Sequence, residues 1–232
     1  MNSMQRLRTA LAEPTDSVVR SYLTLRKAIG WLGILLPFGV SLGAWFIFGD
    51  TRQSSISAYY YTGTRNLLVG MLCAIGVFML TYKGPQRVDE AVSFLAGLFA
   101  VGIAFFPTAP VYSPSSFQTT IGRLHYTFAA LFFSLITYMT LCLFTRGDPA
   151  GFTRKKRQRN AVYRVCGWIM FGCVVLLVVQ ALLPDEVQGN LKAHQSTFWL
   201  EATAIISFGI AWLTKGEFVL ADEPGEGSDL RA

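Results

Sequence analysis

Charged residues are scarce in this chain. Lys, Arg, Asp and Glu together make up 15% of its 232 residues, whereas a soluble globular domain carries about 25%. Hydrophobic residues take their place at 52%, with 18 phenylalanines among them. The composition therefore argues against an ordinary soluble domain.

Histidine and the short motifs of common enzyme classes are also nearly absent. The chain has two histidines, His125 and His194. It contains no HExxH zinc motif, no GxSxG nucleophile elbow, no phosphate-binding loop and no dinucleotide fingerprint. The sequence therefore predicts no cofactor and leaves open whether the chain is an enzyme.

The positions of the cysteines do not predict disulfide bonds. All four cysteines fall within long apolar runs or at the end of one, namely Cys73, Cys142, Cys166 and Cys173. None lies in a loop expected to face the outside, where an oxidising environment would favour disulfides. We interpret them as small packing residues.

What the sequence does contain is long apolar runs. A helix needs roughly 20 apolar residues to cross the hydrocarbon core of a bilayer. Six runs approach this length: Gly30–Phe48, Leu67–Tyr82, Ala91–Phe106, Tyr126–Thr145, Val165–Leu183 and Thr197–Thr214. They predict an all-α fold, a polytopic membrane bundle of six transmembrane helices spanning 29–217. The segment 1–28 is expected to be a retained N-terminal segment and the acidic segment 218–232 a disordered tail.

The positions of the basic residues predict the orientation. Of the 20 Lys and Arg residues, 16 lie in the N-terminal segment, the 82–90 and 145–165 loops and the tail, and 4 lie in the loops 49–66, 107–124 and 184–196. Basic residues favour the cytoplasmic side, so both termini are expected there. This asymmetry accounts for the net charge of +6 without a nucleic-acid partner. The run RKKRQR at 154–159 is best explained as a topology signal, with contact to anionic headgroups as the alternative.

Glycine and alanine recur in the first and third runs. Small residues allow membrane helices to approach closely. Gly30, Gly33, Ala96 and Gly97 are therefore expected on helix packing faces and not in a ligand site.

Glu201 is the only acidic residue inside any of the apolar runs, and it follows His194 by seven residues. On a continuous helix this spacing is about two turns and places both side chains on one face. A charge at bilayer depth costs a few kcal/mol at least, so it normally has a partner or a task.

The two histidines have matching positions relative to the cytoplasmic ends of their runs. His194 precedes Lys215 by 21 residues, and His125 precedes Arg146 by the same number. At about 1.5 Å per residue this is roughly 31 Å, one hydrocarbon thickness. Both are therefore expected at the outer mouths of two helices, with Glu201 about 10 Å below.

These positions define a candidate binding site at the outer face. Its expected members are Arg65, Arg123, His125, His194, Glu201, Tyr59, Tyr60, Tyr61 and Asn66, with Ser57 nearby. The arginines would hold an anion, the tyrosines would form a hydrogen-bonding wall, and Glu201 with a histidine would exchange protons. In the structural alternative, Glu201 forms an ion pair with Arg65 or Arg123 and the tyrosines are an ordinary interfacial belt.

Metal binding is a weaker hypothesis for the same residues. Two histidines and a glutamate match a catalytic zinc set in kind, but His194 and Glu201 are too far apart on one helix to share an ion. Haem held by the two histidines is weaker still. The sequence therefore predicts no metal site.

One helix carries a family resemblance. The stretch GRLHYTFAALFFSLITYMTLCLF at 122–144 resembles the histidine-bearing helix of the FRAG/DRAM/Sfk-type membrane proteins and of uncharacterised bacterial six-span proteins distantly similar to them. The likeness is carried by His125, Ala129, Ala130, Phe132 and Phe133. It implies a bacterial inner-membrane location and a lipid-facing role, because eukaryotic members are linked to lipid remodelling, autophagy and recruitment of lipid kinases.

The leading functional hypothesis is an outward-facing polar pocket that binds a lipid headgroup or a similar amphiphile. Its alternatives are a membrane-embedded lipid-modifying enzyme, a proton-coupled small-solute transporter and a structural or assembly subunit. Membrane lipids are the expected partners, and self-association into a homo-oligomer is left open.

Overall fold

The structure, a computed structural model, describes residues 3–147 and 151–220, with side chains from residue 19 onward apart from those of Asp185 and Lys192. Every regular element in this part of the chain is helical, which confirms the predicted all-α class. The elements are α1 (Ser3–Gly43), η1 (Ala44–Phe48), η2 (Ser57–Tyr61), α2 (Arg65–Leu80), α3 (Arg87–Phe105), α4 (Ser116–Tyr138), η3 (Met139–Leu143), α5 (Arg154–Leu182), α6 (Asp185–Ala193) and α7 (Ser196–Lys215). Most of the predicted tail, 221–232, lies outside the described residues.

Five helical segments are long and apolar enough to cross a membrane. They are Val19–Phe48, Arg87–Phe105, Ser116–Leu143, Arg154–Leu182 and Ser196–Lys215. The remaining predicted run lies in α2, which is apolar but only 16 residues long. At about 1.5 Å per residue, α2 measures roughly 24 Å and is shorter than a hydrocarbon core of about 30 Å. The chain is thus a helical membrane protein.

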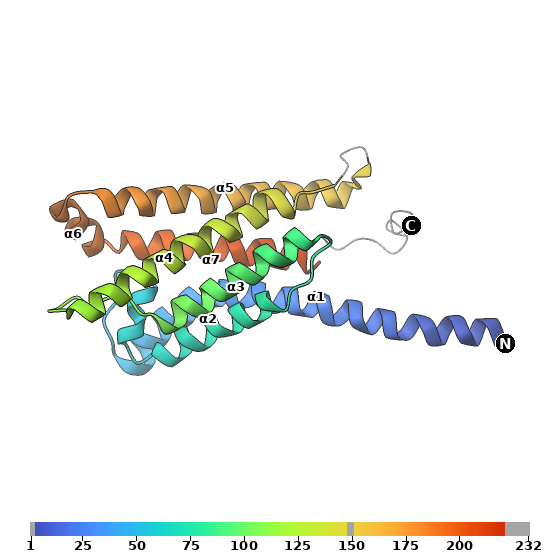
Figure 1. Cartoon of the computed structure of the whole chain (residues 1–232), viewed down its shortest axis with the longest axis horizontal. Coiled ribbons are helices and arrows are strands. Elements are labelled where there is room, and N and C mark those ends of the chain that lie inside the picture. The colour runs from blue at the N-terminus through green and yellow to red at the C-terminus, as the bar shows by residue number, and fades with distance from the viewer. Residues whose placement is uncertain (1–2, 148–150, 221–232) are drawn as a thin grey trace.

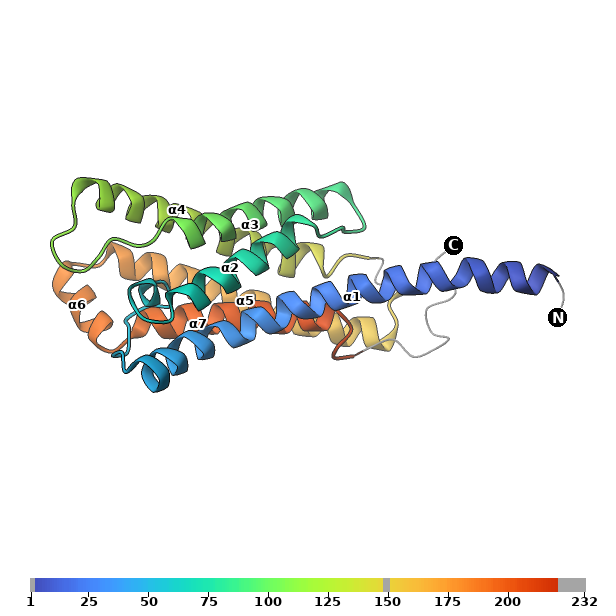
Figure 2. The same cartoon turned by 90° about the horizontal axis from the view of Figure 1, so that it is seen from below.

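The long helices lie side by side as a bundle, and the first part of α1 extends beyond it (Figures 1 and 2). We call the end where α1 enters and α7 finishes the terminal end; it includes the segments 81–86, 144–147 and 151–153. The distal end is the opposite end, formed by 49–64, 106–115 and 183–195. The segment 184–196 was expected to be a loop, but most of it forms the short helix α6.

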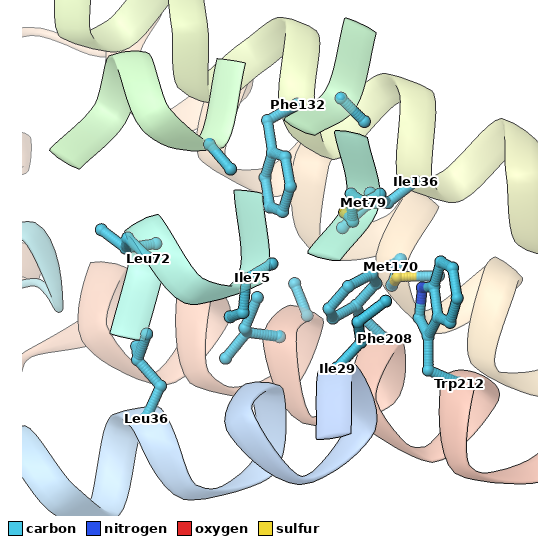
Figure 3. Close-up of a cluster of buried hydrophobic side chains, with 14 of the residues drawn as sticks. Ile29, Leu36, Leu72, Ile75, Met79, Phe132, Ile136, Met170, Phe208 and Trp212 are labelled. Atoms are coloured by element: carbon cyan, nitrogen blue, oxygen red, sulfur yellow. The ribbon is translucent and has the colours of Figure 1, made fainter. Parts of the chain in front are cut away.

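Helix α7 occupies the interior of the bundle, packed mainly against α1 and α5. In its most apolar window 61% of residues are buried, compared with 28% in α1 and in α5. Aromatic and aliphatic side chains from several helices meet around it (Figure 3). The central group contains Ile29, Ile75, Met79, Phe132, Met170, Phe208 and Trp212. A polar residue on α7 is therefore surrounded more by protein than by lipid.

Glycines bring two pairs of helices into backbone contact, as the small-residue pattern predicts. A Cβ atom at Gly209 of α7 would lie 2.6 Å from the carbonyl oxygen of Gly30 of α1. A Cβ atom at Gly97 of α3 would lie 2.7 Å from the carbonyl oxygen of Gly76 of α2. No real side chain tolerates such distances, so these crossings require glycine.

Candidate functional site

The distal end is organised around the segment 50–63, which leaves α1 and returns to α2. Gly49 closes η1 in the left-handed conformation, with φ of 70°. The Asp50 carboxylate then accepts a hydrogen bond from the Gly63 amide at 2.8 Å. The two ends of the segment are thus joined, and its middle turns inward toward α4 and α7.

Glu201 holds this segment from α7. Its Oε2 accepts a hydrogen bond from the Ile56 amide at 2.6 Å, and the Ser57 amide faces the same carboxylate. Ile56 directly precedes the 3₁₀ helix η2 and offers no side-chain cap of its own. Because helix N-termini leave amide groups unpaired and carry a partial positive charge, the Glu201 carboxylate serves as the missing cap.

A backbone contact reinforces this attachment. The Phe198 amide, in the first turn of α7, donates to the Ser54 carbonyl at 2.9 Å. The Phe198 ring also lies against the buried Tyr59, with centroids 6.1 Å apart. The start of α7 therefore holds the 50–63 segment through main chain, side chain and ring.

His125 holds the same segment from α4. The residue is 3% exposed, with Nδ1 2.7 Å from the Phe106 carbonyl oxygen and Nε2 3.0 Å from Ser57 Oγ. A carbonyl only accepts, so Nδ1 carries a proton and donates it to Phe106; in the neutral ring Nε2 then accepts from Ser57. Both ring nitrogens are occupied by protein groups and neither is open to a metal.

Glu201 and His125 therefore act on adjacent residues, Ile56 and Ser57, from two different helices. The sequence predicted that they lie near each other, and the structure brings them together through these two residues. The arrangement is that of a clamp on η2, which we call the distal clamp: Glu201, His125, Ile56 and Ser57.

His194 lies apart from this clamp. Helix α6 ends at Ala193 and α7 begins at Ser196, with Gln195 between them in the left-handed conformation. His194 is exposed, and its Nδ1 contacts the Asn190 carbonyl at 2.9 Å. The expectation that His194 and Glu201 share one helical face is therefore wrong, because the helix is interrupted between them.

The three consecutive tyrosines of η2 have different surroundings. Tyr59 is buried. Tyr60 accepts a hydrogen bond from Arg65 Nη2 at 2.7 Å, and the guanidinium carbon lies 4.3 Å from the centre of its ring. The Tyr61 hydroxyl donates to the Thr108 carbonyl at 2.5 Å, and burial raises the pKa of Tyr61, with Tyr60 adding to the effect. Tyr61 thus stays protonated as a donor that joins η2 to the 106–115 segment.

The remaining predicted site residues, Arg123 and Asn66, are exposed. Neither makes a side-chain hydrogen bond or ion pair with the part of the chain that the structure describes. In the same part of the chain, Glu201 forms no salt bridge with Arg65 or Arg123. The ion-pair alternative expected for Glu201 is therefore not the arrangement observed, because backbone amides take that place.

A small pocket lies beside the clamp. His125, Ser57 and Tyr60 form its polar side, and Leu68, Leu72 and Ile103 are among its apolar lining residues. Its empty volume is about 210 Å³, but it is narrow and admits about one water molecule. The pocket therefore has no room for a ligand much larger than water.

The donor set of the distal end does not form a metal site in the described residues. No group of three or more His, Cys, Asp or Glu side chains lies close enough there to hold an ion. Glu201 and His125 contact Ile56 and Ser57 at the start of η2, and the exposed His194 is not part of this clamp. The zinc and haem alternatives therefore have no matching geometry in this part of the molecule.

Substitution of His125 provides a test of the clamp. We expect His125→Phe to leave the Phe106 carbonyl and the Ser57 hydroxyl without their partner, at about 1–3 kcal/mol for each group that stays buried. Local opening of the 50–63 segment should then increase at least about tenfold. Limited trypsin digestion at the exposed Arg52 measures this opening.

Ser57→Ala is the matched comparison, because it removes one of the two contacts and should have a smaller effect. Equal cleavage rates in the wild type and His125→Phe would show that His125 does not hold the segment.

Comparison with known proteins identified no relative of this chain. No family model, no curated protein and no solved structure matches this chain. The resemblance to FRAG/DRAM/Sfk-type proteins stays a prediction.

Proposed function

We propose that this chain is a six-span protein of the bacterial plasma membrane that binds the anionic headgroup of a lipid or a similar amphiphile at its distal end. In this proposal α2 is the sixth span and the terminal end faces the cytoplasm. The excess of basic residues in the loops of the terminal end supports that orientation.

The observation that supports the proposal is that the two distal arginines lack a counter-charge in the described residues. Arg65 and Arg123 have no carboxylate partner in the described residues, because Glu201 is engaged with backbone amides. Arg65 is also held in place by Tyr60, through one hydrogen bond and a cation–π contact. A fixed guanidinium without a counter-charge is suited to a carboxylate or phosphate, which it binds through two parallel hydrogen bonds.

The proposal assigns different roles to the predicted site residues. Arg65 and Arg123 contact the anion, and Tyr60 orients Arg65. Glu201 and His125 position η2, on which Tyr60 lies, and do not exchange protons with the ligand. Orientation of the arginine before binding lowers the entropic cost of holding the headgroup.

Native mass spectrometry of the detergent-purified protein tests this proposal. The wild type should retain phosphatidylglycerol in preference to phosphatidylcholine, since only the former has a net negative headgroup. The double variant Arg65→Ala/Arg123→Ala should lose about tenfold or more in phosphatidylglycerol retention, because charge-assisted hydrogen bonds contribute about 1.5–3 kcal/mol each.

Arg164→Ala is the control, since Arg164 is an exposed arginine of α5 nearer the terminal end. It should retain phosphatidylglycerol as the wild type does. Equal retention by the double variant and the wild type would refute a distal headgroup site.

A further inference from the structure

The first turn of α5 opposes its own helix dipole. Residues 154–157 are all basic, and no acid lies in this turn. The N-terminus of a helix carries a partial positive charge, so acidic side chains stabilise it and basic ones do not. The Thr153 hydroxyl caps this end by accepting the Lys156 amide at 3.1 Å, but it adds no negative charge. An acidic group from elsewhere in the chain would therefore be stabilising at the start of α5.

The basic run at the start of α5 has an exposed side. Lys156 and Arg159 are half-buried, whereas Arg154 and Arg157 are exposed. The side chains of Arg154 and Arg157 form no hydrogen bond or ion pair within the described residues. Their spacing of three residues places them on one side of the helix. We call Arg154 and Arg157, with the exposed Gln158 beside them, the outer face of α5.

The outer face lies beyond the headgroup layer of a bilayer. The apolar part of α5 begins at Val165, and Arg157 and Arg154 precede it by 8 and 11 residues. At about 1.5 Å per residue these distances are about 12 and 17 Å along the helix. The headgroup layer on each side of a bilayer is about 5–8 Å thick. Both arginines therefore lie in the aqueous phase, where a soluble segment reaches them more readily than a lipid does.

The end of α7 leads the chain to this part of α5. Glu217, just after α7, is left-handed with φ of 56°, and the chain turns there. Arg159 of α5 then donates Nη1 to the Leu220 carbonyl at 2.9 Å. Because Leu220 directly precedes the segment 221–232, this segment starts beside the basic run of α5.

The segment 221–232 carries the opposite charge to the outer face. One of its 12 residues is basic and four are acidic, namely Asp222, Glu223, Glu226 and Asp229. Six residues of extended chain reach at most about 20 Å, whereas Arg154 lies only about 8 Å along α5 from Arg159. The acidic residues are therefore within reach of both exposed arginines.

We propose that the segment 221–232 binds the outer face of α5, with its carboxylates against Arg154 and Arg157. Docked there, the segment supplies the negative charge that the start of α5 lacks. It also holds the start of α5 against the end of α7. This contact is independent of headgroup binding at the distal end.

Site-specific photocrosslinking of the full chain in nanodiscs tests the proposal. The photoreactive residue p-benzoylphenylalanine replaces Gln158, and mass spectrometry assigns the residues that it crosslinks. Only crosslinks to 225–232 are scored, because the contact of Leu220 with Arg159 keeps 221–224 near α5 in any case. We expect such crosslinks in discs of phosphatidylcholine and equally in discs that contain phosphatidylglycerol. The same photoreactive residue at Val88, an exposed position of α3 at the terminal end, should crosslink 225–232 less.

Charge variants separate docking from simple proximity. Arg154→Gln/Arg157→Gln and Glu226→Gln/Asp229→Asn should each lower crosslinking at least about threefold, because an exposed ion pair shifts an equilibrium by up to about fivefold and two are lost. Exchanging the charges, with Arg154→Glu/Arg157→Glu and Glu226→Lys/Asp229→Lys in one chain, should restore crosslinking. Arg87→Gln removes an exposed arginine of α3 at the same end and should leave crosslinking unchanged.

Three results would overturn the proposal. The first is crosslinking to 225–232 that is absent from the wild type, undiminished in either neutralised variant or not restored by the charge exchange. The second is crosslinking from position 158 to phosphatidylglycerol in place of 225–232, because it would assign the outer face to lipid. The third is equal crosslinking from positions 88 and 158, which would show that the segment does not select α5.

Discussion

Replacing Glu201 with leucine is expected to release the 50–63 segment from α7. The Ile56 amide would lose an acceptor 2.6 Å away, and a hydrogen bond to a charged group contributes about 1.5–3 kcal/mol. Leucine cannot accept a hydrogen bond, so the first turn of η2 would be left without a cap. Hydrogen–deuterium exchange of the peptide that covers 50–63 should become at least about tenfold faster.

Glu201→Gln separates the charge from the hydrogen bond. Glutamine retains a side-chain oxygen that accepts from Ile56 but no longer balances the positive end of η2. Its exchange should therefore fall between those of the wild type and Glu201→Leu. Glu186→Gln, at an exposed position of α6, removes a charge at the same end and should leave exchange unchanged. Unaltered protection of 50–63 in Glu201→Leu would mean that the carboxylate does not hold the segment.

A side chain at Gly209 is expected to destabilise the whole bundle. Its Cβ atom would lie 2.6 Å from the Gly30 carbonyl oxygen and 2.9 Å from the Ile34 amide nitrogen. Both contacts are with the backbone of α1, which cannot rotate away as a side chain can. Overpacking of this kind typically costs about 1–3 kcal/mol, so Gly209→Ala should lower the melting temperature in a fixed detergent and Gly209→Leu should lower it further.

Gly70 of α2 and Gly172 of α5 provide matched controls within other helices of the bundle. A Cβ atom at either position would meet no neighbouring atom within 4 Å. Alanine favours a helix by about 0.8–1.0 kcal/mol relative to glycine in its interior, so Gly70→Ala and Gly172→Ala should be neutral or stabilising. If Gly209→Ala behaves like these controls, α1 and α7 are not in backbone contact.

The distal end contains two kinds of polar residue, those that maintain the fold and those that are candidate ligand contacts. The distal clamp is a structural device, because its charged and polar groups are paired with backbone amides, a carbonyl and a hydroxyl. The arginines beside it, Arg65 and Arg123, form no ion pair with the described residues. The candidate ligand contacts at the distal end are therefore these two arginines, while Glu201 and His125 maintain the scaffold.

The helices themselves could be predicted from composition and from the length of the apolar runs. Each predicted apolar run lies in a helix, because the free energy of placing a segment in a bilayer is close to a sum over its residues. The packing role of Gly30 and Gly97 could also be predicted, because the small size of glycine is a property of the residue type. The helix α6 was missed because it is short and polar on average, so no long apolar run marks it.

The site could be predicted only in part. Glu201 was identified because a charged residue in an apolar run is conspicuous, and His125 because it precedes the basic end of its helix by about one membrane thickness. Both belong to the distal clamp. Their partners were not identifiable, because the Ile56 amide and the Phe106 carbonyl are groups that almost every residue has. His194 was wrongly aligned with Glu201, since the helix is broken at Gln195, which is left-handed, and no glycine or proline marks that position in the sequence.

The sequence by itself determined that this is a helical membrane protein with one acid inside an apolar run near one end and most of its basic residues near the other. Both properties depend on residue type and order alone. Only the tertiary structure decided that Glu201 caps η2 and forms no ion pair with the described residues, and that Lys156 and Lys215 both lie against Phe144. Those outcomes depend on which helices lie side by side, and the packing of side chains between helices controls that choice.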